Sequence, residues 1–174
     1  MVVITVSGFS GVGKTTIAKD LASRLGIPYY SAGTFFRKKA AEKGMTIKEF
    51  MKIAPPELHK EADEFIDKVS KEGEGVLDGR LTGFMASGAD FRVFLKASPE
   101  VRAARMAERE DIDVKKAAKE LTERDEQDIQ NYIKIYGIDM RDLSIYDLIL
   151  NTDALNEKEV LEVVELAIRR ALKI

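Results

Sequence analysis

The sequence predicts an α/β fold in which a parallel sheet is covered on both faces by helices. Strand-like and helix-like segments alternate along all 174 residues, which is typical of parallel strands joined by helical crossovers. The first of these segments, VVITVS, is β-branched and almost entirely apolar, as expected of a strand buried on both faces. The length fits one domain over residues 1–174, and the sequence contains no internal repeat, low-complexity segment or linker.

The sequence signals are clearest for the first strand and the first helix. The strand over 2–7 leads through a glycine-rich turn into a helix over 13–25, whose apolar residues recur at helical spacing. Gly26 and Pro28 end this helix, because proline cannot continue it and glycine accepts the backbone of a helix end. A second, shorter strand is predicted over 27–31.

The middle of the chain is predicted to be largely helical. One helix covers 33–44, and a charged helical stretch covers 46–71. This stretch is interrupted at 54–57, because two adjacent prolines end one helix and start the next. Strands follow over 73–80, between glycine-rich turns, and over 90–98.

The last third continues the alternation of helix and strand. A helix with Ser98 as its N-cap covers 99–110, and a strongly charged helix covers 114–135. The last strand is predicted over 146–152. The last helix covers 156–172 and carries an apolar stripe for packing against the sheet.

Composition places the chain among soluble globular proteins. Apolar residues make up 45% and charged residues 33%, and the formal net charge is −2. This balance provides no global basic field for nucleic acid or an anionic membrane. Cysteine is absent, which excludes disulfides, thiolate metal sites and a cysteine nucleophile. We expect a cytoplasmic monomer that binds neither membrane nor nucleic acid.

The most specific motif is GFSGVGKTT, residues 8–16, between the first strand and the first helix. Its spacing, Gly8-x4-Gly13-Lys14-Thr15, is that of a P-loop, a turn whose backbone N–H groups enclose a phosphate. Glycines are needed because Cβ atoms would obstruct the inward-pointing amides, and the helix N-terminus adds partial positive charge. The predicted fold class is therefore a three-layer fold of the P-loop NTPase type.

This motif predicts a site for a nucleoside triphosphate with Mg²⁺. Lys14 is expected to reach the β- and γ-phosphates as a catalytic residue, and the Thr15 hydroxyl to ligate Mg²⁺. The residues expected to bind this purine or pyrimidine triphosphate are Gly8, Phe9, Ser10, Gly11, Val12, Gly13, Lys14, Thr15 and Thr16. The alternative is a glycine-rich turn that only joins strand to helix, and the complete motif in this context argues against it.

Two arginines near the carboxyl edge of the predicted sheet suit a second phosphate. Arg37 lies near the start of the helix after the second strand, and Arg80 follows the third strand in VLDGRLTG. Ligands of open parallel sheets bind at this edge, and arginine binds phosphate in a bidentate manner. Arg37 could instead be a solvated residue beside two lysines. Asp78, in the same turn as Arg80, could hold a magnesium-bound water or pair with Arg80.

Further arginines share one face of the helix after the fourth strand. Arg102, Arg105 and Arg109 are spaced i, i+3 and i+7 in SPEVRAARMAERED. A short lid with such arginines would stabilise charge on a transferred phosphoryl group and exclude water, the competing acceptor. The alternative is an exposed helix whose arginines pair with neighbouring glutamates. The next helix places Arg124 and Asp128 on one face, although charged helix faces are most often simply solvated.

With these motifs in place, the chain resembles the nucleoside monophosphate kinases, most closely cytidylate kinases of the archaeal type. The resemblance covers essentially the whole chain and rests on the order of GFSGVGKTT, SAGTFFR, VLDGRLTG, ASPEVRAARMAERE, TERDEQD and YGIDMRDLSIYDLILNT. It implies a five-stranded parallel sheet, a mobile monophosphate-binding region over about 33–72 and a lid over about 100–112. It also implies phosphorylation of CMP or dCMP by ATP with Mg²⁺, giving CDP or dCDP.

The resemblance further implies roles for individual residues. The acceptor nucleotide would be bound by Arg37, Asp78, Arg80, Arg124 and Asp128. Of these, Arg37 and Arg80 would hold the acceptor phosphate, and Asp128 suits the ribose hydroxyls. The catalytic arginines would be Arg80, Arg105 and Arg109, the last two in the lid together with Arg102.

The chain departs from the bacterial branch of cytidylate kinases at several points. Leu81 follows DGR where that branch has an acidic residue, Asn131 replaces a basic residue, and Phe36 replaces a tyrosine. The bacterial segment that reads the pyrimidine has no obvious counterpart here. The residues that read the base therefore cannot be carried over from the resemblance.

The implied transfer needs no general base, because the attacking acceptor phosphate is already anionic. His59 lies away from the motifs and is expected to be a surface or helix-packing residue. Other acceptors stay open, namely AMP or another monophosphate, or a small hydroxylated metabolite such as shikimate. A nucleotide-binding switch protein is a further alternative, whereas net acidity argues against RNA binding.

Overall fold

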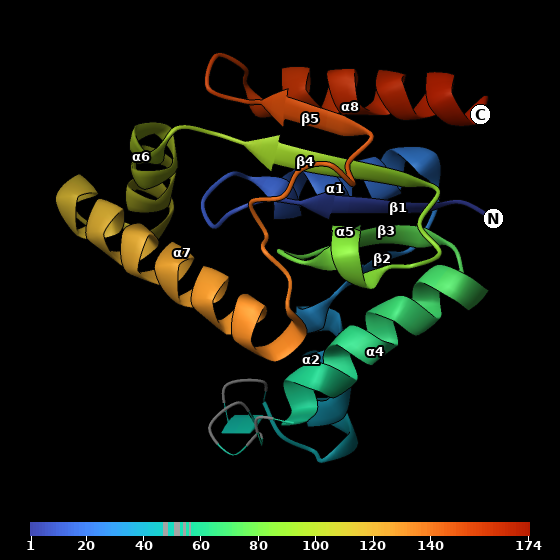
Figure 1. Cartoon of the computed structure of the whole chain (residues 1–174), viewed down its shortest axis with the longest axis horizontal. Coiled ribbons are helices and arrows are strands. Elements are labelled where there is room, and N and C mark those ends of the chain that lie inside the picture. The colour runs from blue at the N-terminus through green and yellow to red at the C-terminus, as the bar shows by residue number, and fades with distance from the viewer. Residues whose placement is uncertain (47–48, 51–52, 54, 56) are drawn as a thin grey trace.

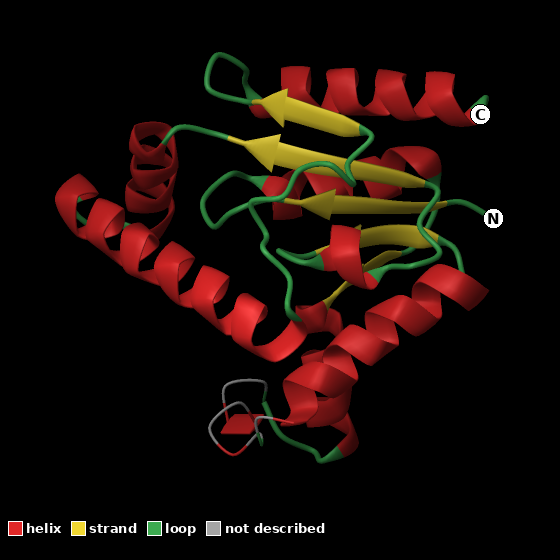
Figure 2. Cartoon of the chain, in the orientation of Figure 1, coloured by secondary structure: helices red, strands yellow, loops and turns green. Residues whose placement is uncertain are grey.

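The structure is a computed structural model that describes residues 1–46, 49–50, 53, 55 and 57–174. Its centre is a five-stranded parallel sheet in the order β2-β3-β1-β4-β5 (Figure 1, Figure 2), which confirms the predicted α/β class. The strands are β1 (Val3–Ser7), β2 (Tyr29–Ser31), β3 (Gly75–Asp78), β4 (Phe91–Lys96) and β5 (Leu148–Asn151). Because every neighbouring pair is parallel, the carboxyl ends of the strands form one edge of the sheet.

Helices cover both faces of the sheet, as the alternation of side chains along β1 shows. The helices are α1 (Lys14–Leu25), α2 (Ala32–Glu42), α4 (Glu57–Glu72), α5 (Thr82–Met85), α6 (Pro99–Glu110), α7 (Val114–Tyr136) and α8 (Glu157–Leu172). Ile4 and Val6 belong to the core shared with α1 and α8, whereas Val3 belongs to the core shared with α4 and α5. Successive residues of a strand point to opposite faces, so these two cores lie on opposite faces of the sheet. The fold therefore has three layers, with the sheet between two layers of helices.

Two helix pairs extend from the sheet, each around a small apolar core of its own. α2 packs on α4 through a cluster that includes Phe35 and Ala62. α6 packs on α7 through a cluster that includes Met106 and Leu121. In Figure 1, α6 and α7 lie on the side to which the strand arrows point, and α7 runs from there towards α4. The carboxyl edge of the sheet therefore faces α6 and α7, and α2 begins at the same edge, directly after β2.

Local sequence signals explain where most helices and strands begin and end. The observed bounds differ from the predicted bounds by only a few residues. Ser98 accepts a hydrogen bond from the Val101 amide at 3.3 Å, which confirms it as the N-cap of α6. The third strand is shorter than predicted at both ends, because residues 73–74 precede the sheet and the chain bends away from it at Gly79 and Arg80. α5 was not predicted, since so short a helix shows no apolar periodicity. The predicted interruption at 54–57 includes residues outside those described.

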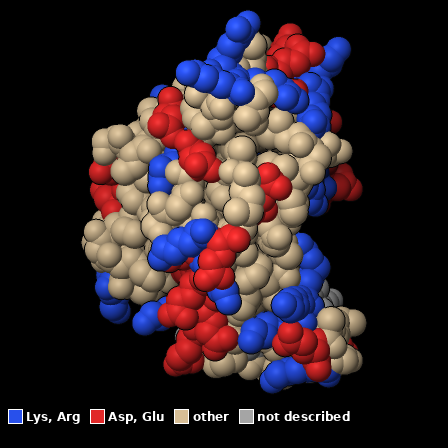
Figure 3. Space-filling model, turned by 90° about the vertical axis from the view of Figure 1, so that its right-hand side faces the viewer, with Lys and Arg blue, Asp and Glu red and all other residues tan. Residues whose placement is uncertain are grey.

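Among the described residues, no helix combines the length and apolarity that crossing a membrane requires. Figure 3 shows the face on the right-hand side of Figure 1, where acidic and basic side chains are interspersed. This mixed surface agrees with the net charge of −2.

Candidate active site

The turn between β1 and α1, residues 8–16, has a backbone suited to enclosing a phosphate, and we call it the phosphate loop. Gly8 has a φ of 153°, and a Cβ atom there would lie 2.5 Å from the carbonyl oxygen of Leu95 on β4. Gly13, the N-cap of α1, has a φ of 92°, a conformation that favours glycine. The turn leads directly into the N-terminus of α1, where Thr16 is exposed and unpaired amides attract anions.

The pKa of Lys14 is affected by charged residues from several elements. Its Nζ lies 3.5 Å from a carbonyl oxygen of the loop, so the side chain folds back over the turn. Burial lowers the pKa of Lys14 to about 8, against the attraction of the Asp78 carboxylate. Smaller effects on the same pKa come from Arg80, Asp128 and Arg109. Charged residues at and after the end of β3, on α6 and on α7 therefore all lie within electrostatic range of one ammonium group.

Asp78, at the end of β3, connects the loop to the sheet. Its Oδ2 accepts hydrogen bonds from Thr15 Oγ1 at 2.7 Å and from the Tyr29 hydroxyl at 2.9 Å. The register pairs Val6 with Asp78, which places this carboxylate beside the end of β1. Asp78 is buried, and its Oδ1 has no hydrogen-bond partner within the part of the chain that the structure describes.

These oxygen atoms fit the magnesium ion that the sequence predicts. Mg²⁺ prefers oxygen ligands, and in phosphate sites it takes few from the protein and the others from phosphates and water. The Thr15 hydroxyl, held against a buried carboxylate with one unpaired oxygen, offers such ligands. Burial and the Asp78 carboxylate raise the pKa of Tyr29 to about 12, so the Tyr29 hydroxyl stays protonated and continues to donate to Asp78.

Two of the three predicted lid arginines bind carbonyl oxygens of the loop. Arg102 donates to the Ser10 carbonyl at 3.1 Å and forms an ion pair with Asp125 of α7 at 2.8 Å. Arg105 donates to the Val12 carbonyl at 3.2 Å and to the segment after β5 at 2.9 Å. Amides that point inward leave the loop carbonyls pointing outward, and these arginines supply their donors.

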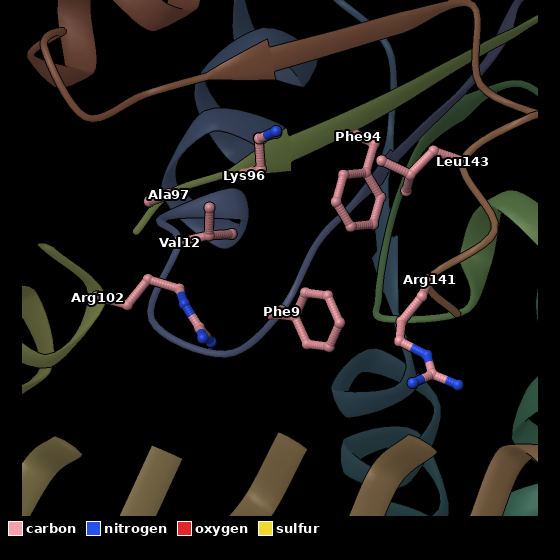
Figure 4. A pocket seen from close by; sticks show the side chains of 8 residues that line it. All are labelled: Phe9, Val12, Phe94, Lys96, Ala97, Arg102, Arg141 and Leu143. Carbon is pink, nitrogen blue, oxygen red and sulfur yellow. The ribbon is translucent and has the colours of Figure 1, made fainter. Parts of the chain in front are cut away.

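A cavity of about 300 Å³ lies beside the loop. Figure 4 shows Phe9 in it, with Arg102 on one side and Arg141 on the other. The Phe9 ring packs edge-on against Phe94, with centroids 6.2 Å apart, and the Arg102 guanidinium lies 5.5 Å from its centroid. The side chain of Phe9 is therefore engaged in packing, and its backbone is the part that can face a phosphate.

Arg109, the third arginine of α6, has a different environment. Its side chain is 61% exposed and pairs with the adjacent Glu110 at 2.7 Å. Its charge nevertheless lowers the pKa of Lys14, which places it within electrostatic range of the phosphate loop. Exposed ion pairs contribute little free energy, so Arg109 can exchange this partner for another anion.

A larger cavity of about 450 Å³ lies between α4, α7 and the bend after β3, and we call it the acceptor cavity after the predicted acceptor residues in its lining. Its lining includes Asp63, Ile66, Asp78, Arg80, Asp128 and Tyr136. Arg80 forms a hydrogen-bonded ion pair with Asp128. Burial raises the pKa of Asp128, against the attraction of Arg80. The structure thus brings three predicted acceptor residues, Asp78, Arg80 and Asp128, to one cavity.

The other two predicted acceptor residues lie at the margins of this region. Arg37 is exposed on α2 next to Gly33, and its charge acts to lower the pKa of Tyr29. Arg124 lies on α7, and its charge acts to lower the pKa of Asp128. Both are close enough to act on the site, although neither lines the acceptor cavity in this conformation.

Sequence reasoning missed the wall of the acceptor cavity where α4 meets α7. The Tyr136 hydroxyl donates a hydrogen bond to Asp63 Oδ2, and the two residues are 73 positions apart. His59, expected as a surface or helix-packing residue, is exposed and also lines this cavity. The available signal was the spacing of Asp128, Tyr132 and Tyr136, which puts them on one face of α7.

Comparison with known proteins places the chain in a family. The Cytidylate kinase-like family matches residues 3–154. A cytidylate kinase from Pyrococcus horikoshii is 45% identical over 170 residues, which cover 95% of this chain and 88% of that protein. A cytidylate kinase from Methanopyrus kandleri is 40% identical in an alignment of 179 positions, gaps included, which covers 96% of this chain and 93% of that protein.

Solved structures agree on the fold. An uncharacterized protein from Eubacterium ventriosum gives a TM-score of 0.76 at 19% identity, with 97% of this chain and 98% of that one covered. A shikimate kinase from Bacteroides thetaiotaomicron gives 0.65 at 18% identity, with 99% of each covered. At these identities the likeness shows the fold alone. From the family match and the 45% identical relative, we conclude that this chain belongs to the cytidylate kinase-like family.

Proposed function

We propose that this chain transfers the γ-phosphoryl group of ATP to CMP or dCMP, giving ADP and CDP or dCDP. The observation that carries this proposal is that Asp78, which lines the acceptor cavity together with Arg80 and Asp128, accepts a hydrogen bond from Thr15 of the phosphate loop at 2.7 Å. A donor site and a cation-bearing acceptor site therefore adjoin, as in-line transfer between two anionic ligands requires. The names of the Pyrococcus and Methanopyrus relatives support a cytidine nucleotide as the acceptor.

The donor triphosphate binds in the loop of residues 8–16, with its β- and γ-phosphates at the N-terminus of α1. Phosphate oxygens beside Lys14 raise its pKa from about 8, so its ammonium group is fully charged in the complex. Thr15 and Asp78 would hold Mg²⁺, directly or through water. When bound, this ion neutralises charge on the donor phosphates.

The acceptor phosphate binds Arg80, and Arg37 and Arg124 complete a ring of guanidinium groups around it. Arg80 is paired with Asp128 in the structure, so an incoming phosphate replaces one anionic partner of Arg80 by another. Asp128 then becomes available to accept hydrogen bonds from the ribose hydroxyls. No general base is needed, because the attacking phosphate is already anionic.

Residues of about 100–112 act as a lid, and residues of about 33–72 act as a mobile acceptor-binding region. Arg105 positions the loop through its bond to Val12 and acts on the donor from there. Arg109 exchanges its exposed pair with Glu110 for the transferred phosphoryl group. This exchange adds positive charge where the transition state needs it and closes the site to water.

An acceptor panel with ATP and Mg²⁺ tests the proposal, with ADP release and the phosphorylated product both measured. CMP and dCMP should be used at least about tenfold more efficiently than UMP, AMP, GMP or shikimate. Turnover of shikimate alone would replace the proposal with a small-metabolite kinase. ATP hydrolysis without any phosphorylated acceptor would indicate a nucleotide-binding switch.

We further propose that the chain works as a monomer in the cytoplasm, in pyrimidine nucleotide metabolism. Lys14, Asp78, Arg80 and Asp128 all come from one chain, so the chemistry needs no residue from a second copy. Light scattering after gel filtration should give a mass near 19.5 kDa. A dimer mass would refute the monomer and leave the proposed reaction untouched.

A further inference from the structure

The acceptor cavity has a polar end that phosphate chemistry does not use. Arg80 and Asp128 lie in electrostatic range of the phosphate loop, whereas Asp63 and Tyr136 lie where α4 meets the carboxyl end of α7. From Asp128 to Tyr136, α7 rises by about 12 Å. This is comparable with the length of a pyrimidine nucleoside monophosphate. A nucleotide with its phosphate at Arg80 can therefore place its base beside Asp63.

The Asp63 carboxylate is held in one orientation. The Tyr136 hydroxyl donates to Asp63 Oδ2, and among the described residues none donates to Oδ1. Burial raises the pKa of Tyr136, and the Asp63 carboxylate raises it further, so the hydroxyl remains a donor. Burial also raises the pKa of Asp63, while Tyr136 and His59 act against it. Oδ1 is thus an oriented acceptor in the cavity wall.

Apolar side chains make up another part of the same lining. They are Ala62 and Ile66 of α4, Leu81 after β3 and Met85 of α5. Ala62, Ile66 and Leu81 are buried, so they form a fixed surface. Such a surface suits the flat faces of an aromatic base and leaves the edges of the base for hydrogen bonding.

We propose that Asp63, positioned by Tyr136, accepts a hydrogen bond from the exocyclic 4-amino group of cytosine and thereby selects cytosine over uracil. The inference rests on the proposed phosphorylation of cytidine nucleotides. An ionised carboxylate only accepts hydrogen bonds. Cytosine presents an amino donor at its C4 position, whereas uracil presents a carbonyl oxygen there. That oxygen would face Asp63 Oδ1 with neither group satisfied, which disfavours uracil.

Steady-state kinetics of Asp63→Asn with CMP and UMP test the proposal. Asparagine keeps the shape of the side chain and adds an NH₂ donor that can face the uracil carbonyl. We expect kcat/KM for CMP to fall about 30- to 100-fold, and the CMP/UMP ratio to fall at least as far. KM for ATP should stay within about twofold. The matched control is Glu64→Gln, which removes the charge of an exposed neighbour on α4 that does not line the cavity.

The same interaction can be removed from the substrate. The 2-pyrimidinone ribonucleoside monophosphate lacks the 4-amino group. The wild-type kcat/KM should therefore be lower for this analogue than for CMP, by a factor similar to the one by which Asp63→Asn lowers kcat/KM for CMP. Asp63→Asn should lose little more when both changes are combined, because both delete one contact. Tyr136→Phe should raise KM for CMP several-fold with kcat nearly unchanged, and lower the CMP/UMP ratio less than Asp63→Asn. A purely structural role for Tyr136 would lower thermal stability and leave that ratio unchanged.

A folded Asp63→Asn with a CMP/UMP ratio within about twofold of the wild type overturns the inference. If this variant does not fold, the wild type itself decides, since equal efficiency on CMP and its amino-free analogue overturns the inference too. Wild-type protein that phosphorylates no cytidine nucleotide is a different outcome, because it removes the proposed function.

Discussion

At the scale of single residues, Lys14 is the most informative position, since its ammonium group is partly buried and still surrounded by charge. Burial outweighs the carboxylates near it and lowers its pKa to about 8. A buried cation with a lowered pKa is held at a cost to stability when no ligand is present. An anionic triphosphate would remove this cost. The buried ammonium group therefore lowers the stability of the free protein, and binding of the triphosphate restores it.

Replacement of Lys14 by Met should separate activity from folding. Turnover should fall at least about 100-fold, because a cation at the transferred phosphoryl group is lost. Thermal unfolding should not occur at a lower temperature, because a buried charge is removed at the same time. The comparison is with Lys119→Met, an exposed lysine of α7. Turnover within a few-fold of the wild type in Lys14→Met would contradict the role of the phosphate loop.

The lowered pKa of Lys14 also predicts how stability depends on pH. Between pH 8 and 10.5, the ordinary pKa of a lysine side chain, the unfolded chain keeps this proton while the folded chain releases it. Stability of the wild type relative to Lys14→Met should therefore rise by about 2 kcal/mol from pH 7 to pH 10. Urea unfolding of both proteins at the two pH values measures this difference, in which other titrating groups cancel. A constant difference would show that Lys14 titrates normally.

Asp78 predicts the response to magnesium. Its Oδ1 is buried without a partner among the described residues, while Oδ2 accepts from Thr15 and Tyr29. In Asp78→Asn the amide can keep accepting both bonds, but the charge that attracts Mg²⁺ is lost. The Mg²⁺ concentration for half-maximal turnover should rise at least about tenfold. Asp139→Asn, an exposed carboxylate paired with Arg141, is the control. An unchanged magnesium requirement would remove Asp78 from the metal site.

At the scale of elements, α6 supports the phosphate loop from outside. The Arg102 side chain is 10% exposed and joins Asp125 of α7 to the Ser10 carbonyl of the loop. Arg102→Met would leave a buried carboxylate unpaired, which costs about 3 kcal/mol. The unfolding temperature should fall by about 10 °C, and KM for ATP should rise as the loop loses a support.

The double variant Arg102→Met with Asp125→Leu distinguishes the two effects. It removes the unpaired charge, so most of the unfolding temperature should return, because an apolar pair can replace a buried ion pair. KM for ATP should stay raised, since the Ser10 carbonyl still lacks its donor. Recovery of both quantities together would mean that the loop does not depend on Arg102.

Elements with a local signal were predictable, and contacts between distant elements were not. The loop from Gly8 to Thr15 and the Ser98 cap depend on residues next to one another, so sequence alone identified them. The face of α6 was also predictable, but not that Arg102 would bind Ser10 and Asp125 while Arg109 remained exposed. That division depends on how α6 packs on α7, which no spacing within α6 encodes.

The distinction between local motifs and contacts of distant elements also explains which parts of the candidate site were predictable. Arg80 and Asp128 were predicted separately, and their pairing appears only when α7 crosses the sheet edge. Asp63 and Tyr136 were not selected at all, because each looks like an ordinary residue of a charged helix. Prediction was best for the phosphate end, whose loop is a local motif, and poorest for the end where two helices from different parts of the chain meet.

At the scale of the whole molecule, the sheet with α1 and α8 is a body to which two smaller ones are attached. The α2–α4 pair and the α6–α7 pair each have an apolar core separate from the main core. A separate core allows the α6–α7 pair to move relative to the sheet without unpacking, whereas α4 also packs on the sheet through Ile66 and Leu77, so the α2–α4 pair moves only by repacking that contact. The Tyr136–Asp63 bond joins the two pairs across the acceptor cavity, so their motions should be coupled.

This arrangement predicts closure that requires both substrates. A bisubstrate analogue, with adenosine and cytidine joined through a chain of phosphates, should slow amide hydrogen exchange in α2 and α6 at least about tenfold and reduce the radius of gyration. A non-hydrolysable ATP analogue alone should protect the loop and α6 but leave α2 unprotected, because the acceptor half is missing. Arg37→Ala supplies the matched test: it changes an exposed residue of α2, so folding should be preserved while the bisubstrate analogue loses its effect on α2. Equal exchange rates in free and fully bound wild-type protein would show that the helix pairs are rigid parts of the scaffold.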